Sequence, residues 1–324
     1  MSERTYVAAV REALRQALSD DERVVLLGED IGAGGAFRAT EGLLDEFGPE
    51  RVRDTPICED AFTGVAVGLA LEGWRPVVEY QFADFLTSGM TQIANVAAKM
   101  HFRAGLAVPL VIRAPSGGGF SGGPFHSQSP EAWFLHTPGL KVACPATAED
   151  AGALLTAAIA DPNPVLVFEQ KNLYTRVKAA GNGSAPPDVR LEGAAVRRPG
   201  RDVTVVSYGA AVHLALAAAG ELSARGIEAE VIDLRVLCPL DWETVASSVR
   251  KTSRCLVAHE DYAEYGVAAE LCSRVASELF RELDAPVARV GSAFHPVPFS
   301  PPLEAATLPS ADSITAAIEE VATF

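Results

Sequence analysis

The feature that most constrains the fold is a regular alternation of short apolar runs with longer stretches of helical periodicity. In the first half of the chain, apolar runs predict strands over residues 24–27, 76–81, 109–114, 141–145 and 165–169. Helix-forming stretches separate these runs, and strands that alternate with helices form parallel sheets. We therefore predict an α/β domain with a parallel sheet over residues 1–175.

The same alternation resumes after a break. Residues 176–202 include a Gly, Asn, Ser, Ala and Pro segment at 181–187, which is typical of a linker between domains. Beyond it, apolar runs at 203–208, 229–234, 255–259 and 287–290 alternate with helical stretches at 210–224, 241–250, 266–283 and 313–322. This pattern predicts a second, smaller α/β domain over residues 203–324.

Composition excludes several classes of protein. A chain of 324 residues with 48% hydrophobic content is long enough for two domains with real cores. Its net charge of −15 and the lack of a basic stripe argue against a nucleic-acid-binding protein. The five cysteines are scattered, without the close pairs of a zinc site or a disulfide framework. With no signal-peptide core and no membrane-spanning apolar run, we expect a cytoplasmic protein.

One carboxylate stands out at the start of an apolar helix. The segment 52–57 predicts a short strand that ends at a proline, and the apolar run 61–70 predicts a buried helix. Glu59 lies between them, in the first turn of that helix, where the helix dipole favours a negative charge. From position alone Glu59 is either a helix-capping acid or an acid that serves a bound ligand.

A glycine-rich segment precedes a histidine. Gly117, Gly119 and Gly122 satisfy a G-x-G-x-x-G pattern, but a dinucleotide site requires these glycines to open a helix directly. Pro124 interrupts, and the next helix is predicted to begin at residues 129–131, with a serine cap and a proline in the first turn. We expect a flexible loop that presents His126, which is either a surface residue or a catalytic one. The other histidines lack metal-ligand spacing.

Several ordered blocks resemble one protein family. They are 28–31 (GEDI), 54–59 (DTPICE), 81–85 (QFADF), 126–134 (HSQSPEAWF), 138–142 (PGLKV) and 231–235 (VIDLR). From about Thr5 to Phe324 the chain resembles the β subunit of the E1 component of 2-oxoacid dehydrogenase complexes. The resemblance implies a transketolase-like fold, with a thiamine diphosphate pyrimidine-binding domain at 1–175 and a transketolase C-terminal-like domain at 203–324. It also implies an α2β2 heterotetramer with an E1 α subunit, and E2 dihydrolipoyl acyltransferase as a partner.

The resemblance assigns roles to individual residues. It implies that Glu59 hydrogen-bonds the aminopyrimidine ring of thiamine diphosphate, and that Ile57, Gln81 and Phe85 line the cofactor pocket. His126 matches the family histidine implicated in transfer of the acyl group to a lipoyl arm, a step in which an imidazole gives a proton. The implied activity is that of an oxidoreductase that acts on an oxo group with a lipoyl disulfide as acceptor.

The resemblance also implies a structural potassium ion, held mainly by backbone carbonyls. The corresponding positions are Val108, Leu110, Val111, Ala158, Asp161 and Asn163. A plain proline turn at 161–164 is the equal alternative, because carbonyl ligation leaves no side-chain signature. The Gly-Asp-Gly motif that holds the diphosphate and Mg²⁺ in such enzymes is missing from this chain. We therefore expect Mg²⁺ to be held mainly by the α subunit, and the isolated chain to bind the cofactor poorly.

Other functions remain open on the sequence alone. A pyruvate, branched-chain or acetoin enzyme, or a split transketolase-like carboligase subunit of a biosynthetic pathway, would share the fold and Glu59. A scaffold that docks an E2 core would share only the fold. The retained His126 favours a lipoyl-acylating enzyme. The blocks at 81–85 and 129–132 are closer to the branched-chain and acetoin types than to many pyruvate enzymes, but the substrate is not determined.

Overall fold

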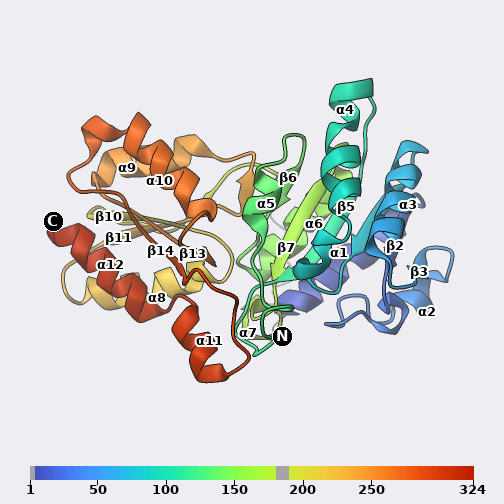
Figure 1. Cartoon of the computed structure of the whole chain (residues 1–324), viewed down its shortest axis with the longest axis horizontal. Coiled ribbons are helices and arrows are strands. Elements are labelled where there is room, and N and C mark those ends of the chain that lie inside the picture. The colour runs from blue at the N-terminus through green and yellow to red at the C-terminus, as the bar shows by residue number, and fades with distance from the viewer. Residues whose placement is uncertain (1–3, 180–189) are drawn as a thin grey trace. The chain divides into compact units, whose positions relative to one another are not determined.

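The computed structural model describes residues 4–179 and 190–324, and within them the chain forms two compact units (Figure 1). Unit 1 consists of the chain up to Ser116 together with Trp133–Leu191. Unit 2 consists of Gly117–Ala132 together with Glu192–Phe324. The glycine-rich segment therefore belongs to unit 2, although it lies within the predicted first domain.

The predicted linker contains regular structure. It includes β8 (Lys178–Ala179), which pairs with β1 (Arg4–Thr5), and β9 (Ala195–Arg198). Residues 180–189 of this segment, which include the whole predicted Gly, Ser and Pro tract at 181–187, lie outside the described residues.

Unit 1 is built on a parallel sheet. Its strands are β2 (Val24–Gly28), β3 (Val52–Asp54), β4 (Arg75–Glu79), β5 (Val111–Ser116), β6 (Lys141–Ala143) and β7 (Val165–Gln170), and they lie in the order β6-β7-β5-β4-β2-β3. Each neighbouring pair is parallel. Most of the strand residues are buried, as expected of a sheet covered on both faces. The prediction of a parallel α/β fold is confirmed.

Helices connect these strands. They are α1 (Tyr6–Asp20), α2 (Leu43–Phe47), α3 (Glu59–Leu71), a π-helical segment (Thr91–Ala97), α4 (Ala98–Ala104), α5 (Glu131–Leu135), α6 (Ala148–Ala160) and α7 (Leu173–Arg176). Helix α1 packs against α6, and the side chains of Thr5 and Thr147 cap the two helices. Helix α5 starts at Glu131, within the range 129–131 predicted for its start.

Unit 2 holds a second sheet. Its strands are β9, β10 (Val203–Ser207), β11 (Ala229–Asp233), β13 (Cys255–Tyr262) and β14 (Ala288–Ser292), in the order β14-β13-β10-β11-β9. All pairs are parallel except β11 with β9. The helices are α8 (Ala211–Ser223), α9 (Trp242–Thr252), α10 (Val267–Glu278), α11 (Pro301–Thr307) and α12 (Ala311–Thr323), and α8 packs against α12. Helix α11 and strand β9 were not predicted.

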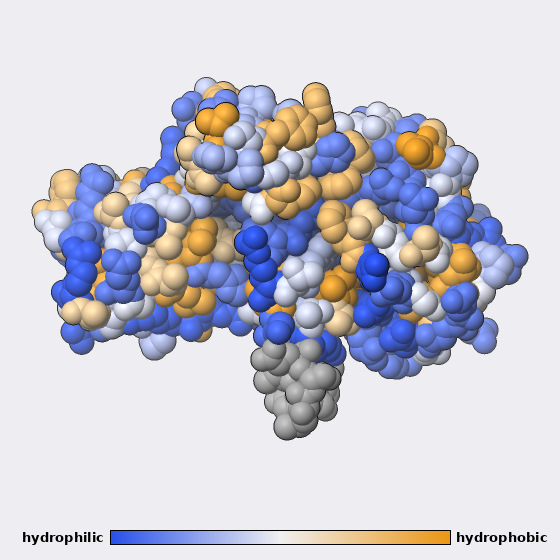
Figure 2. Space-filling model, turned by 90° about the horizontal axis from the view of Figure 1, so that it is seen from below, coloured by the Kyte–Doolittle hydropathy of each residue, from blue (hydrophilic) through white to orange (hydrophobic). Residues whose placement is uncertain are grey.

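The surface is mixed in hydropathy. On the face drawn in Figure 2, hydrophilic residues are interspersed with small groups of apolar side chains. Within residues 4–179 and 190–324, none of the helices has the length and apolar character that a membrane span requires.

Candidate functional site at the carboxyl edge of the first sheet

Three neighbouring strands of unit 1 end at the same edge of the sheet. Gly28, the last residue of β2, is in register with Asp54 at the end of β3 and with Glu79 at the end of β4. Because the strands are parallel, the segments that follow them begin side by side (Figure 1). The carboxyl edge of a parallel sheet is where open α/β proteins bind ligands. This edge carries Glu29, Glu59 and Gln81.

Glu59 begins helix α3, and no described residue balances its charge. The side chain is half-buried, and it forms no hydrogen bond or ion pair with any residue that the structure describes. Only its backbone carbonyl is engaged, as the acceptor of a 3.5 Å hydrogen bond from the Tyr80 hydroxyl. A capping acid would accept backbone N–H groups at the helix start, and Glu59 does not. Its carboxylate is therefore available to a ligand.

A second acid lies close to Glu59. Glu29 is 6% exposed, and its Oε1 atom has no hydrogen-bond partner among the described residues. Burial raises the pKa of Glu29, and the negative charges of Glu59 and Asp30 raise it further. A buried acid with an unpaired oxygen beside a second, unpaired carboxylate indicates a site that is completed by something other than this chain.

The other predicted pocket residues surround the same edge. The Gln81 side-chain amide donates a 3.1 Å hydrogen bond to the Asp30 carboxylate. Phe85 is half-buried in the 3₁₀ segment Ala83–Thr87, and its ring lies 5.7 Å from that of Phe82. Ile57 is 82% exposed, so in this chain it lines no closed pocket and presents an apolar surface to whatever approaches Glu59. The set combines an acid, an amide and apolar surfaces, which suits a planar nitrogen heterocycle.

His126 lies in unit 2, so the structure does not bring it together with Glu59 within one unit. Its side chain is half-buried, and its backbone N–H donates a 3.3 Å hydrogen bond to the carbonyl of Gly123. The expectation of a flexible loop needs correction. Backbone N–H groups of the glycine segment are bonded to carboxylates of Glu260 and Glu304, two residues that sequence reasoning missed. Neither lies in a recognisable motif.

The two segments proposed to hold potassium do lie together. The N–H of Val108 donates to the carbonyl of Pro162 at 3.0 Å, and that of Val165 donates to the carbonyl of Leu110 at 2.9 Å. The Asp161 carboxylate is already paired with the Lys141 ammonium and accepts from the backbone N–H of Asn163. Potassium at Val108, Leu110, Val111, Ala158, Asp161 and Asn163 stays a prediction.

Metal binding by side chains has no candidate cluster among the residues that the structure describes. Among residues 4–179 and 190–324, histidine, cysteine and acidic residues form no group of three that could hold a metal ion. The cysteines are all free thiols.

Comparison with known proteins identifies both units. Residues 2–177 match the family model described as the pyrimidine binding domain of transketolase, and residues 192–314 match that of the transketolase C-terminal domain. The chain is 42% identical to the 2-oxoisovalerate dehydrogenase subunit beta of Bacillus subtilis, with all of both chains covered. The chain belongs to the family of E1 β subunits of 2-oxoacid dehydrogenases. Within this family it is also 41% identical to the pyruvate dehydrogenase E1 component subunit beta of the same organism, with 93% of each covered.

Comparison with solved structures shows a similarity in fold as well as in sequence. This E1 β-family chain superimposes on a split-gene transketolase, solved as an inactive β4 tetramer, with a TM-score of 0.78 and 26% sequence identity over 99% of both chains. A plant relative, the pyruvate dehydrogenase E1 subunit beta-2 of Oryza sativa, is 44% identical, with 97% of this chain and 87% of the relative covered. These identities are too similar to separate a pyruvate from a branched-chain substrate.

Proposed function

We propose that this E1 β-family chain is the β half of a thiamine-diphosphate-dependent enzyme that decarboxylates a 2-oxo acid, pyruvate or branched-chain, and acylates the lipoyl groups of E2. The observation that carries the proposal is the carboxylate of Glu59. Among the described residues it has no hydrogen-bond or ion-pair partner, and it lies at a sheet edge in a domain that matches a pyrimidine-binding family. A carboxylic acid shared with a ring nitrogen is the interaction that this position lacks.

The residues of the edge fit the pyrimidine half of the cofactor. Glu59 would hold a proton between its carboxylate and a ring nitrogen. Glu29, whose Oε1 has no hydrogen-bond partner among the described residues, would add a second acidic group near it. Ile57 and Phe85 would pack against ring surfaces and exclude water, and Gln81 would orient the ring by hydrogen bonding. When bound, thiamine diphosphate supplies an electron sink for the bond that breaks beside the ketone.

In the same proposal His126 serves the second half-reaction. One sulfur of the lipoyl disulfide takes the acyl group, and the electron pair released by oxidation of the acyl carbon breaks the S–S bond. The other sulfur takes a proton, which in this proposal comes from His126. An imidazole suits this step, because its ordinary pKa lies near neutral pH.

The other half of the site must come from a partner. The missing Gly-Asp-Gly motif supports an E1 α subunit that holds the diphosphate and Mg²⁺ in an α2β2 assembly. E2 dihydrolipoyl acyltransferase would be the acceptor of the acyl group. Potassium at the backbone carbonyls of residues 108–111 and 158–163 is kept in the proposal as a structural ion.

A reconstituted assembly tests the proposal. The chain is co-expressed with an E1 α subunit, and decarboxylation of pyruvate and of 2-oxoisovalerate is measured alongside acylation of a lipoyl domain. We expect one of the two acids to be decarboxylated and the lipoyl domain to be acylated. Inactivity towards both acids in an assembly that binds thiamine diphosphate would contradict the proposal.

Two alternatives share the site, and the fold neighbour bears on the first. A split transketolase or another carboligase would share the sheet edge and Glu59, and would transfer its carbon unit to an aldehyde or ketone. An acetoin dehydrogenase β subunit would instead cleave acetoin and still acylate lipoate. Acetoin cleavage and carboligation assays on the same assembly separate these enzymes from a 2-oxoacid dehydrogenase.

A further inference from the structure

Two buried carboxylates of unit 2 hold the glycine loop that leads to His126. The backbone N–H of Gly118 donates to Oε1 of Glu260 at 2.7 Å. The N–H of Gly119 donates to Oε1 of Glu304 at 2.9 Å, and that of Ser121 donates to Oε2 of Glu304 at 2.9 Å. Glu304 therefore binds the loop with both oxygens. These N–H groups are not available to a phosphate, which agrees with rejection of a dinucleotide site.

Among the described residues, the carboxylate of Glu304 bonds only to this loop. It is 4% exposed on helix α11, and it forms no ion pair with any residue that the structure describes. Each hydrogen bond of its carboxylate among those residues goes to Gly119 or Ser121. A buried carboxylate is stable only when hydrogen bonds replace its water, and bonds from N–H groups to a charged oxygen are about twice as strong as neutral ones. The N–H groups of the loop therefore stabilise the buried carboxylate of Glu304, and the carboxylate in turn stabilises the conformation of the loop.

The loop needs such an anchor because its backbone is unusual. Gly117, Gly119 and Gly123 have φ of 81°, 85° and 69°, and Ser121, which is not a glycine, has φ of 60°. A serine in the left-handed region is disfavoured unless other contacts hold it there. Its N–H bond to Glu304 supplies such a contact. Without this hydrogen bond, Ser121 could relax to a backbone conformation with negative φ, which costs less energy.

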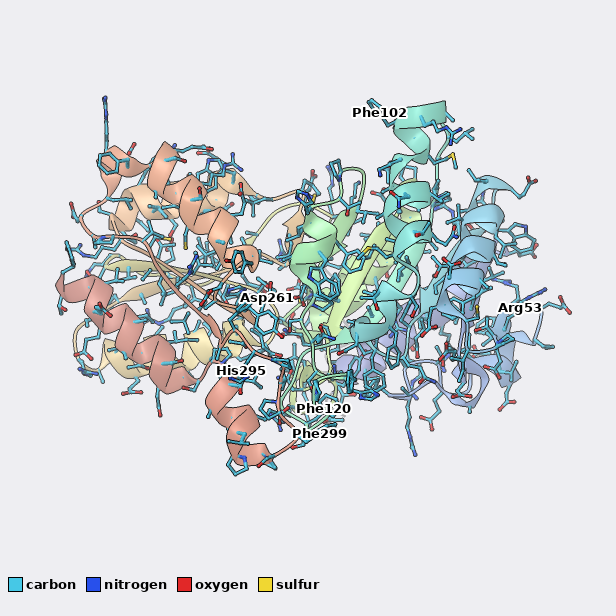
Figure 3. All side chains as sticks on the ribbon, viewed as in Figure 1. Arg53, Phe102, Phe120, Asp261, His295 and Phe299 are labelled. Atoms are coloured by element: carbon cyan, nitrogen blue, oxygen red, sulfur yellow. The ribbon has the colours of Figure 1, made fainter. Side chains whose placement is uncertain are left out.

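The loop also packs closely on the chain just before α11. A Cβ atom at Gly123 would lie 2.3 Å from the ring of Phe299, so no larger residue fits there. Figure 3 labels Phe120 and Phe299 at this contact, beside α11. Gly123 in turn accepts the hydrogen bond from the backbone N–H of His126. A short, continuous series of contacts thus links Glu304 and its flanking segment to the histidine.

We propose that Glu304 is a positioning residue for His126: its carboxylate fixes the glycine loop and so holds the imidazole where a lipoyl arm must meet it. The inference rests on the proposed function, because it assigns His126 to the acylation of lipoyl groups. It adds that this half-reaction depends on a residue of α11 that touches neither cofactor nor lipoyl group.

The test separates the two half-reactions in the reconstituted assembly. Glu304→Gln keeps the shape of the side chain, but it removes the charge and turns one of the two acceptors into an N–H₂ donor. We expect acylation of a lipoyl domain to slow by about 10- to 100-fold, since small misplacements of a catalytic group have effects of this size. Decarboxylation measured with an artificial electron acceptor should change by less than about threefold, because the Glu59 half of the site is intact.

A matched variant controls for general damage to unit 2. Glu230 is also 4% exposed, and its carboxylate accepts from the backbone N–H of Gly200 and pairs with Lys251. Glu230→Gln removes another buried charge of unit 2 without touching the glycine loop, so it should leave the ratio of the two half-reactions unchanged. Amide hydrogen exchange gives an independent readout. The amides of Gly119 and Ser121 should exchange faster in Glu304→Gln and at the wild-type rate in Glu230→Gln.

The outcomes are distinguishable. If wild type and Glu304→Gln acylate the lipoyl domain equally well, the inference is overturned and the proposed function stands. If the wild-type assembly acylates no lipoyl domain, the proposed function fails and the inference fails with it. An equal loss of both half-reactions in Glu304→Gln would show a merely structural residue. Should that variant not fold, Glu304→Asp keeps the charge with a shorter reach and should show a smaller, still selective loss of acylation.

Discussion

Glu29 lies close enough to Glu59 that the negative charge of Glu59 adds to the effect of burial and raises the pKa of Glu29. Neither acid has a cation to compensate it among the described residues. Two carboxylates that repel each other without a counter-charge destabilise the folded chain, and proteins retain such pairs mainly at functional sites. The relationship between these two acids therefore yields a prediction about stability and another about activity.

We predict that Glu29→Gln stabilises the chain in a pH-dependent way. A raised folded pKa means that the native state holds the proton more tightly than the unfolded chain, so the contribution of Glu29 to stability is lost as pH rises from the ordinary carboxyl range through the folded pKa. Because glutamine does not ionise, Glu29→Gln removes the loss of stability that ionisation of Glu29 causes at higher pH. The gain in Tm over wild type should therefore be larger at pH 8 than at pH 5.5. The exposed acid Glu72 supplies the control, since Glu72→Gln should give no such difference. A gain that is equal at both pH values would contradict the prediction.

We predict that Glu59→Gln inactivates the assembly without unfolding it. The amide keeps the shape but cannot share an acidic proton with a ring nitrogen, and general acid–base groups contribute about 10² to 10⁴-fold to rates. Steady-state decarboxylation in the reconstituted assembly should fall by that range, while Tm stays within about 2 °C of wild type, as expected for a half-buried side chain that makes no hydrogen bond.

The next residue provides the control for Glu59. Asp60 is an exposed acid in the same helical turn, and its carboxylate accepts a 3.2 Å hydrogen bond from Gln92. Asp60→Asn should retain most of the activity. If both variants lose activity to the same degree, the helix start rather than the Glu59 carboxylate would be responsible.

We predict that the core of unit 1 depends on the guanidinium of Arg113. This side chain is 1% exposed, donates two 2.7 Å hydrogen bonds to Glu169, and also pairs with Glu79. Removing one partner of a buried ion pair leaves an uncompensated charge and costs about 3–5 kcal/mol. Arg113→Ala should lower the free energy of unfolding in urea by at least that amount, and Arg113→Lys should lower it substantially, since an ammonium cannot bind Glu169 through two parallel bonds.

An exposed pair shows the contrast. Arg53 is bonded to Glu50 at 2.6 Å, but the two side chains are 51% and 86% exposed (Figure 3). Surface pairs contribute about 0–1 kcal/mol, so Arg53→Ala should barely change unfolding. Equal effects of Arg113→Ala and Arg53→Ala would show that the buried network does not stabilise unit 1.

The sequence predicts the sheets because their strands are buried apolar runs, each bounded by turn residues. It also predicts that Glu59 and His126 matter, through the family blocks. It does not predict that residues 117–132 fold with unit 2, because that depends on contacts of Gly118 with Glu260 and of Gly119 with Glu304, which are 142 and 185 residues apart along the chain. Nor does it predict α11, a helix of seven residues that opens with two prolines and has no long apolar periodicity. Long-range hydrogen bonds and short helices leave little local signal.

We predict that Gly139 is required by its backbone surroundings. Its φ is 102°, and a Cβ atom there would lie 1.9 Å from the backbone carbonyl oxygen of Ala98. Gly139→Ala must therefore both strain the backbone and move α4, and its cost should exceed the roughly 1–2 kcal/mol of a left-handed alanine alone. Gly105, which follows the end of α4, has φ of 69°, and a Cβ atom added there would have no atom within 4 Å. A substitution at Gly105 therefore measures the cost of the backbone strain without a steric clash. In urea unfolding, Gly105→Ala should cost about 1 kcal/mol and Gly139→Ala at least twice as much. Equal costs would mean that α4 shifts without penalty, and the close approach of Gly139 to Ala98 would then contribute nothing to stability.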